Sequence, residues 1–199
     1  MALILGLTGS IATGKSTVSL MFDDFNIPVV DADKVAREVV CPGEKAYDQI
    51  IQTFGDTVLR EDKTIDRPKL GEIVFADESK RMQLNEIVHP SVREKMLQHK
   101  NEFVDRGAQC VVLDIPLLFE SKLTHFVDKT IVVAVEKKVQ LQRLMERDQY
   151  NEEEAKQRIH SQMSIDEKVE LADAVIDNNG TKSQSYEQLE SLLHKWNVL

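Results

Sequence analysis

The chain has 199 residues, of which 42% are hydrophobic and 30% are charged, and it contains 8 Gly, 5 Pro and 2 Cys. This length and apolar content predict one globular domain with a substantial core, and they exclude disordered, collagen-like and low-complexity classes. The net charge of −9 argues against a protein that coats nucleic acid, and two cysteines cannot form a disulfide framework or a four-ligand zinc site.

No apolar run approaches the ~20 residues that a membrane-spanning helix needs, so we expect a soluble, cytoplasmic protein. Five short, continuous apolar runs instead indicate buried strands, at residues 2–7, 27–30, 110–115, 130–135 and 174–176. Stretches with helical periodicity separate these runs. We therefore predict an α/β fold in which a parallel sheet is covered by helices on both faces, with the whole chain, 1–199, forming a single domain.

The first strand is followed by Gly9-Ser10-Ile11-Ala12-Thr13-Gly14-Lys15-Ser16, which matches the pattern G-x-x-x-x-G-K-[ST]. The two glycines permit backbone angles that direct successive N–H groups into one concavity, and the helix that begins there adds its positive end. Lys15 supplies a positive charge for the β- and γ-phosphates, and the Ser16 hydroxyl is the expected protein ligand of Mg²⁺. We therefore predict that residues from Gly9 through Thr17 bind ATP and that Ser16 binds the metal.

The chain lacks the motifs of two other classes of nucleotide-binding protein. It has no Asn-Lys-x-Asp guanine signature, which a regulatory GTPase should carry. The strand that ends at Asp114 is not followed by a glutamate that could polarise water, which a helicase or motor ATPase should have. These absences favour phosphoryl transfer to a bound acceptor. An ATPase that needs no acceptor and a catalytically silent nucleotide-binding module remain alternatives.

Two carboxylates, Asp31 and Asp33, follow the second strand, where a parallel sheet presents its functional edge. In an extended chain they would point the same way, so that one could approach Mg²⁺ while the other accepts the proton of an attacking hydroxyl. Alternatively, either residue could serve as the N-cap of the next helix. Asp114, at the end of the third strand, is a candidate contact for Mg²⁺ or the acceptor.

Residues 34–107 form too long a connection for one crossover helix, and we predict a mainly helical insertion with helices near 44–54, 69–75 and 90–104. His89-Pro90 indicates the start of a helix with Pro90 at its first position, so that a structural role for His89 is the simpler interpretation. Three arginines of this insertion could contact substrate phosphates: Arg37, Arg67 and Arg93.

Residues 136–170 follow the fourth strand and are too charged to be core, so we predict a helical flap there. Arg143 and Arg147 lie four residues apart, a spacing that disfavours an isolated helix but suits a helix facing a polyphosphate. Such a flap could deliver arginine charge to the transferring phosphoryl group while excluding water. A solvated face, in which Glu146 and Asp148 neutralise the arginines, is the alternative.

Over almost its whole length the chain resembles the dephospho-CoA kinase family. The resemblance rests on six strings in this order: Gly6-Leu7-Thr8-Gly9-Ser10, Asp31-Ala32-Asp33 with Arg37, Leu84-Asn85-Glu86-Ile87-Val88-His89-Pro90, Asp114-Ile115-Pro116-Leu117-Leu118-Phe119-Glu120, Gln142-Arg143-Leu144-Met145-Glu146-Arg147-Asp148 and Asp177-Asn178-Asn179-Gly180. The phosphate-loop string is generic, whereas the Asp114–Glu120 string in combination with the others is specific.

The resemblance implies a P-loop kinase fold with a five-stranded parallel sheet, in which 34–107 is the acceptor-binding insertion and 136–170 is the lid. It implies that ATP with Mg²⁺ phosphorylates the ribose 3′-hydroxyl of dephospho-CoA; another nucleoside or a small alcohol is the alternative acceptor. We expect no nucleic acid, membrane or obligate protein partner. Expected catalytic residues are Asp33 as general base with Lys15 and Arg143. Expected ATP contacts also include Arg147, Asn178, Asn179 and Gly180, and expected acceptor contacts are Asp33, Arg37, His89, Arg93 and Asp114.

Overall fold

A computed structural model describes residues 2–199 and divides the chain into two compact units. The first, called the sheet unit here, comprises the chain up to Val30 together with Glu102–Leu199. The second, the inserted unit, is Asp31–Asn101. Within residues 2–199, no helix combines the length and the apolar character that are needed to span a membrane.

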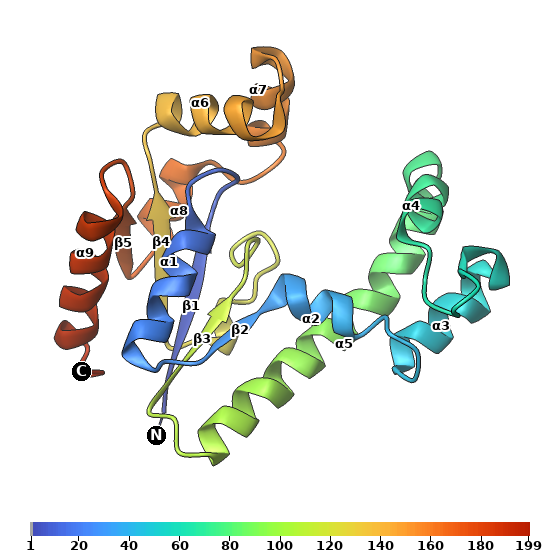
Figure 1. Ribbon diagram of the computed structural model, residues 1–199, viewed down its shortest axis with the longest axis horizontal. Coiled ribbons are helices and arrows are strands. Elements are labelled where there is room, and N and C mark those ends of the chain that lie inside the picture. The colour runs from blue at the N-terminus through green and yellow to red at the C-terminus, as the bar shows by residue number, and fades with distance from the viewer. Residues whose placement is uncertain (1) are drawn as a thin grey trace. The chain divides into compact units, whose positions relative to one another are not determined.

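The sheet is parallel and has the strand order β2-β3-β1-β4-β5 (Figure 1). Each of the five predicted apolar runs forms one strand, and the strands are β1 (Leu3–Gly9), β2 (Val29–Asp31), β3 (Cys110–Asp114), β4 (Lys129–Ala134) and β5 (Ala174–Asp177). The central strand β1 pairs with β3 through Leu3–Leu7 and with β4 through Leu5–Gly9. The predicted α/β class with five parallel strands is therefore confirmed.

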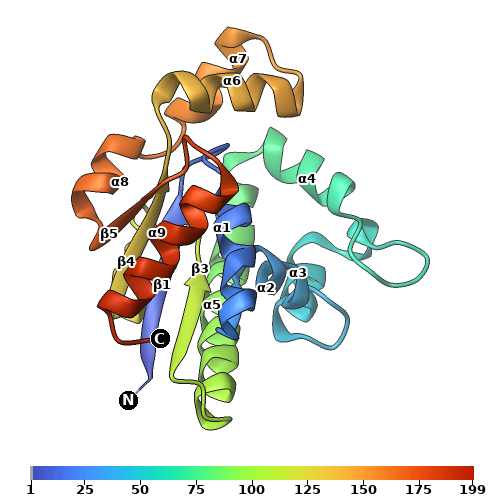
Figure 2. The same cartoon turned by 60° about the vertical axis from the view of Figure 1, so that its left-hand side comes forward.

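One face of the sheet packs against α1 (Lys15–Met21), the 3₁₀ helix η1 (Phe22–Phe25) and α9 (Lys182–Lys195), as Figure 2 shows for the two α-helices. Leu5 and Leu7 of β1 point into this core, and its other completely buried side chains include Val18, Phe22, Val112, Ile131, Val133, Ile176, Leu189 and Leu193. Because side chains alternate along a strand, Gly6 and Thr8 face the opposite side of the sheet, where Leu118 and Val127 lie over Gly6. The 3₁₀ helix η3 (Thr124–Phe126) precedes β4 on this side.

Three helices connect β4 to β5: α6 (Lys137–Asp148), α7 (Glu152–His160) and α8 (Ile165–Leu171). The starts of α7, α8 and α9 each carry a capping box, in which the side chain before the helix and the third helical side chain bond each other's backbone N–H. The predicted flap is therefore helical, and two of its three helices, α7 and α8, begin with a capping box. Its last part, α8, packs beside β4, and Lys168 within it is completely buried, which its charge did not predict.

The inserted unit contains α2 (Ala32–Glu38), α3 (Lys45–Phe54), the 3₁₀ helix η2 (Asp56–Val58), α4 (Arg67–Ala76) and most of α5 (Glu78–Asp105), which continues into the sheet unit. It has a small core of its own, formed by Tyr47, Ile50, Val58, Ile65 and Leu70. The helical character predicted for this region is confirmed, and the predicted helix near 69–75 corresponds to α4.

The prediction that a helix begins at Pro90 is wrong, because α5 begins at Glu78 and continues through Pro90. A proline inside a helix removes one backbone hydrogen bond, here the one that residue 90 would donate to the Glu86 carbonyl oxygen. The next residue, Ser91, donates its hydroxyl to the Ile87 carbonyl oxygen at 3.1 Å. Apolar packing on both sides holds the helix together: Ile87 and Val88 lie against the core of the inserted unit, and Met96 is buried. Packing therefore outweighs the local helix-breaking tendency.

Candidate functional site

The loop between β1 and α1 is folded tightly on itself. The backbone N–H and the hydroxyl of Thr13 both donate to the Ser10 carbonyl oxygen, at 3.2 and 2.9 Å. Gly14 has a φ of 87°, in the left-handed region, and a Cβ there would lie 2.1 Å from the Asn178 side-chain nitrogen. Ala12 is also left-handed, with a φ of 62°. A strained, non-glycine residue in such a loop is typical of a binding site whose conformation is fixed in advance by its surroundings.

Lys15, the first residue of α1, contacts the carboxylate of Asp114 at the end of β3. Asp114 is only 2% exposed, and the Lys15 side chain is largely buried. The fold therefore brings together two predicted site residues that are 99 positions apart in the chain. Asp114 thus holds the Lys15 ammonium at the phosphate loop, where the ammonium can also bind a phosphate group.

Asn178, which directly follows β5, supports the phosphate loop from behind. Its side-chain amide donates to the Thr13 carbonyl oxygen at 2.8 Å, and its side-chain oxygen accepts from the Ser185 hydroxyl at 2.7 Å. Both partners are buried, as is Asn178 itself. The side chain of Asn178 is therefore occupied in holding the loop, and its backbone is engaged as well, because its N–H donates to the Ala134 carbonyl oxygen at 2.8 Å and its carbonyl oxygen accepts from Arg143.

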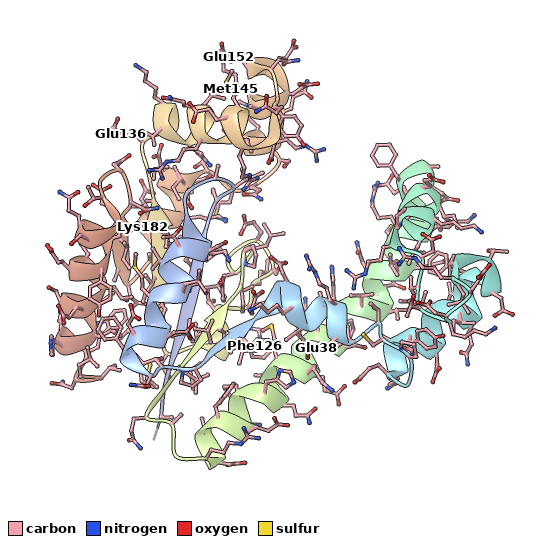
Figure 3. The ribbon with its side chains drawn as sticks, viewed as in Figure 1. Glu38, Phe126, Glu136, Met145, Glu152 and Lys182 are labelled. Carbon is pink, nitrogen blue, oxygen red and sulfur yellow. The ribbon has the colours of Figure 1, made fainter. Side chains whose placement is uncertain are left out.

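The next two residues, Asn179 and Gly180, are exposed. The Asn179 side-chain oxygen accepts from the backbone N–H of Glu136, the residue that precedes α6 (Figure 3), at 2.8 Å. The turn after β5 is thus tied to the start of the helix that carries the two predicted lid arginines.

Those two arginines have different environments. Arg143 is half-buried and donates to the Asn178 carbonyl oxygen at 3.1 Å, which places its guanidinium beside Gly14 of the phosphate loop. Arg147 is exposed and makes two hydrogen bonds of 2.8 Å to Asp148. These bonds raise the pKa of Arg147 and lower the pKa of Asp148. Arg147 is therefore neutralised by Asp148 on a solvent-exposed face, which is the alternative considered for both arginines, whereas Arg143 lies beside the phosphate loop.

Sequence analysis missed three residues that bond the loop, Gln140, Gln162 and Lys168, and also Glu120, which pairs with Lys168. Gln140 of α6 donates to the Ile11 carbonyl oxygen at 2.8 Å, and the Ile11 N–H donates to the side-chain oxygen of Gln162 at 2.9 Å. Gln140 and Lys168 are completely buried at positions where helical periodicity places an apolar residue, one turn from Leu144 and Ile165 respectively. That mismatch between polarity and periodicity is the signal that could have identified them.

Asp31 and Asp33 differ from the predicted pair of aligned carboxylates. Asp31 is the N-cap of α2, and its carboxylate accepts the backbone N–H groups of Asp33 at 2.8 Å and Lys34 at 3.1 Å. Asp33 already lies in the first helical turn, so the assumption of an extended chain through both residues is wrong. The capping alternative is confirmed for Asp31, and Asp33 is left as an exposed carboxylate.

The predicted acceptor contacts of the inserted unit are accessible. Arg37 and His89 are exposed and Arg93 is half-buried, and within the part of the chain that the structure describes their side chains make no hydrogen bond to the protein. A cavity of about 220 Å³ in the same unit is lined mainly by apolar side chains, among them Val40, Leu70, Val74 and Val88, together with Arg67. Such a pocket can accept an apolar group next to a positive charge.

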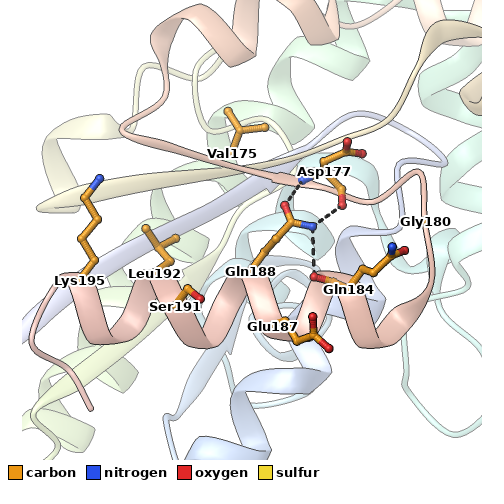
Figure 4. Close-up of a pocket in the computed structure, with 9 residues that line it drawn as sticks. All are labelled: Val175, Asp177, Gly180, Gln184, Glu187, Gln188, Ser191, Leu192 and Lys195. Atoms are coloured by element: carbon orange, nitrogen blue, oxygen red, sulfur yellow. Dashed lines mark hydrogen bonds between the residues drawn. The ribbon is translucent and has the colours of Figure 1, made fainter.

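A larger cavity, of about 700 Å³, lies between β5 and α9 (Figure 4). Gly180 is the only predicted site residue among those described that line it. The Gln188 side chain crosses it and bonds both the N–H and the carbonyl oxygen of Asp177, at 2.9 and 2.8 Å. Gln188 thus satisfies backbone groups of the edge strand, and this cavity is separate from the phosphate loop.

Residues 2–199 contain no cluster of three or more His, Cys, Asp or Glu side chains that could hold a metal ion on its own. A site completed by phosphate oxygens needs fewer protein ligands. The exposed hydroxyl of Ser16 and the carboxylate of Asp114 are oxygen donors of the kind that Mg²⁺ prefers, so the residues present fit a nucleotide-bound Mg²⁺.

Comparison with known proteins gives a consistent result. The model of the family described as dephospho-CoA kinase matches residues 3–184. The dephospho-CoA kinase of Oceanobacillus iheyensis is 57% identical over 198 residues, which cover 100% of both chains. Among solved structures, a Thermus thermophilus protein has 30% identity and a TM-score of 0.81, and the dephospho-CoA kinase of Campylobacter jejuni has 31% identity and a TM-score of 0.76. Each alignment covers 98% of this chain and 97% of the other.

Proposed function

The chain belongs to the dephospho-CoA kinase family, and from this premise we propose how its residues divide the work of the reaction. It is a kinase that uses ATP to phosphorylate dephospho-CoA in coenzyme A biosynthesis. In the proposed reaction, the oxygen of the ribose 3′-hydroxyl bonds to the γ-phosphorus, the bond from that phosphorus to the bridging oxygen of ADP breaks, and the hydroxyl proton passes to a carboxylate. We place this reaction in the cytoplasm.

Lys15 and Arg143 are proposed to stabilise the charge of the phosphoryl group during transfer. The observation that carries this assignment is the phosphate loop itself, in which Gly14 is left-handed, Lys15 contacts Asp114, and the Arg143 guanidinium lies beside Gly14. Groups that are fixed in advance need no rearrangement when charge develops, and this is the main source of catalysis in phosphoryl transfer. Arg147 is a second candidate, because its bonds to Asp148 are exposed and can exchange for a phosphate.

Asp33 is proposed to orient the acceptor hydroxyl and to receive its proton. Its carboxylate is exposed, and the neighbouring Asp31 already serves the helix cap, so Asp33 is the carboxylate of this pair that a substrate can use. Phosphoryl transition states are loose, and the hydroxyl therefore needs accurate orientation more than full deprotonation.

Ser16 and Asp114 are proposed to hold the Mg²⁺ of the nucleotide, and Asp114 is also a proposed contact of the acceptor. When bound, the ion neutralises negative charge on the β- and γ-phosphates. The turn Asn178–Gly180 is proposed to bind the adenine of ATP mainly through the exposed residues Asn179 and Gly180, since the side chain and the backbone of Asn178 already have partners within the protein.

The inserted unit is proposed to bind dephospho-CoA, and residues 136–170 are proposed to act as a lid. Arg37, His89 and Arg93 offer accessible donors to the diphosphate of the acceptor. The small apolar pocket beside Arg67 suits part of the long, weakly polar arm of the same molecule.

ADP release measured with and without dephospho-CoA tests the proposal. Release that depends on dephospho-CoA is the expected result, and a panel of other nucleosides and small alcohols should give little. Equal release without any acceptor would indicate an ATPase, and no release would indicate a silent binding module. Parent ATP affinity and parent kcat in Lys15→Ala would contradict the role of the phosphate loop.

A further inference from the structure

Lys168 is a charged side chain with no exposed surface. Its ammonium nitrogen donates to the carbonyl oxygens of Gly9 at 2.8 Å and Pro116 at 3.2 Å, and it lies 2.8 Å from the Glu120 carboxylate oxygen Oε1. These three acceptors match the three N–H groups of a lysine ammonium. The whole charge of Lys168 is therefore committed to three protein groups.

Two of those groups, the carbonyl groups of Gly9 and Pro116, lie at or near proposed site residues in the chain. Gly9 is the last residue of β1 and the first of the phosphate loop, and a Cβ there would lie 3.0 Å from the Val133 carbonyl oxygen. Pro116 follows Asp114 by two residues, and its carbonyl oxygen also accepts from the Thr8 hydroxyl at 2.9 Å. By bonding both carbonyl groups, Lys168 fixes the start of the phosphate loop at Gly9 in position relative to the chain segment that follows Asp114.

The third group, Glu120, connects Lys168 to the end of the proposed lid. Its Oε1 accepts the backbone N–H of Met163 at 3.2 Å, in the segment between α7 and α8. The Ser10 hydroxyl contacts the Met163 carbonyl oxygen at 3.4 Å, so the phosphate loop reaches the same segment. The second carboxylate oxygen of Glu120, Oε2, is buried and has no hydrogen-bond partner within residues 2–199. The charge of Lys168 therefore compensates the burial of Glu120.

Stability alone does not account for a lysine at this position. Taking an ammonium and a carboxylate out of water is costly, and well-packed apolar residues of similar volume often stabilise a protein equally well or better. The first turn of α8 would place an apolar residue here, beside Ile165. What the ammonium adds is a defined position for the Gly9 and Pro116 carbonyl groups.

We propose that Lys168 and Glu120 form a positioning pair for phosphoryl transfer. Lys168 touches neither substrate, and it acts by fixing the peptide group at which the Gly9–Ser16 loop begins. Glu120 holds the ammonium in place and links the loop to the segment that ends the lid. This inference rests on the proposed role of the phosphate loop.

Three variants test the pair: Lys168→Met, Glu120→Gln, and the double variant. Measurements are kcat, KM for each substrate, ATP affinity by calorimetry, and Tm. We expect Lys168→Met to lower kcat about 10–100-fold and to weaken ATP binding, because small misplacements of reacting groups have effects of this size, while KM for dephospho-CoA changes less than about threefold. Glu120→Gln leaves the ammonium buried without a counter-charge and should lower Tm most. In the double variant Tm should recover while the loss of kcat remains.

That separation of Tm from kcat distinguishes positioning from a purely structural role. Recovery of both quantities in the double variant, or parent kcat and ATP affinity in Lys168→Met, would overturn the proposal. If Lys168→Met does not fold, the comparison of kcat and Tm between the double variant and Glu120→Gln tests the proposal instead. The matched control is Lys129→Met, which removes an exposed ion pair with Asp173 in the same unit and should keep the parent kcat. A defective Lys15→Ala beside unaffected Lys168 variants would overturn only the positioning role, whereas an unaffected Lys15→Ala would overturn the phosphate-loop assignment itself.

Discussion

The proposed site residues of the sheet unit and those of the inserted unit are held very differently. In the sheet unit, Lys15 contacts a buried aspartate, and Arg143 bonds a backbone carbonyl. The phosphate loop itself is anchored by Asn178. In the inserted unit, Asp33 and Arg37 are exposed at the start and end of the short helix α2, and their side chains make no hydrogen bond within residues 2–199.

This difference indicates two strategies for binding. The phosphates of ATP are compact and uniformly anionic, and a rigid loop with donors fixed in advance suits such a group. The acceptor is larger and more varied in polarity, and exposed side chains can adapt to it. We therefore expect substitutions of the proposed site residues in the sheet unit to change both stability and nucleotide handling, and substitutions of Asp33 or Arg37 in the inserted unit to change turnover or acceptor binding with little effect on Tm.

Among the substitutions that test this comparison, Asp33→Asn should have the largest effect. We expect kcat to fall about 10²–10⁴-fold, because an amide cannot accept the hydroxyl proton, while ATP affinity and Tm stay near the parent values. Steady-state kinetics, nucleotide calorimetry and thermal unfolding measure these three quantities. Near-normal turnover would remove Asp33 from the proposed role, and a large loss of Tm would show that the residue also supports the fold.

Arg143→Ala should have the next largest effect, in the sheet unit. We expect kcat to fall about 10²–10³-fold, as is typical when one preorganised donor is removed, with a smaller change in KM for dephospho-CoA. Tm should also fall, because Arg143 bonds the Asn178 carbonyl oxygen. Arg147→Ala, four residues along the same helix, is the matched control and should change kcat less than Arg143→Ala. The reverse pattern, with acceptor binding affected most, would reassign Arg143 to the acceptor site.

The parts of the structure that were predictable from sequence are those determined by local patterns. Continuous apolar runs identified all five strands, and the glycine and lysine spacing identified the phosphate loop. The ambiguity at Asp31 and Asp33 was also local, and the N-cap preference of aspartate decided it.

What could not be predicted depends on partners far away in the chain. Lys168 is 159 residues from Gly9, and no local pattern indicates that a lysine will be buried against that carbonyl. The supporting role of Asn178 likewise depends on Thr13, 165 residues away. At Pro90, local preference gave the wrong answer because apolar residues both before and after Pro90 in α5 are packed, which keeps the helix continuous.

Asp31→Ala should have a moderate effect that concerns stability first. Loss of an N-cap that bonds two backbone N–H groups should lower the free energy of unfolding by about 1 kcal/mol, measured by urea denaturation. Asp31→Ser, which can still cap the helix, is the control and should lose less. If Asp31→Ala kept full stability but lost turnover as severely as Asp33→Asn, Asp31 would belong to the catalytic groups and the contrast between the two residues would fail.

The two cysteines offer the mildest test of the contrast, because each unit contains one. Cys110 is buried in β3, and burial raises the pKa of its thiol to about 12, whereas Cys41 of the inserted unit is exposed. The thiolate is the reactive form, so at pH 8 Cys110 is almost entirely protonated and should not react. Iodoacetamide should therefore add one label to the native protein, at Cys41, and two labels after unfolding in urea, as counted by mass spectrometry. A native Cys41→Ser variant should take up none; rapid labelling of Cys110 in that variant would show that the core of the sheet unit opens as readily as the inserted unit, and the proposed difference in rigidity would not hold.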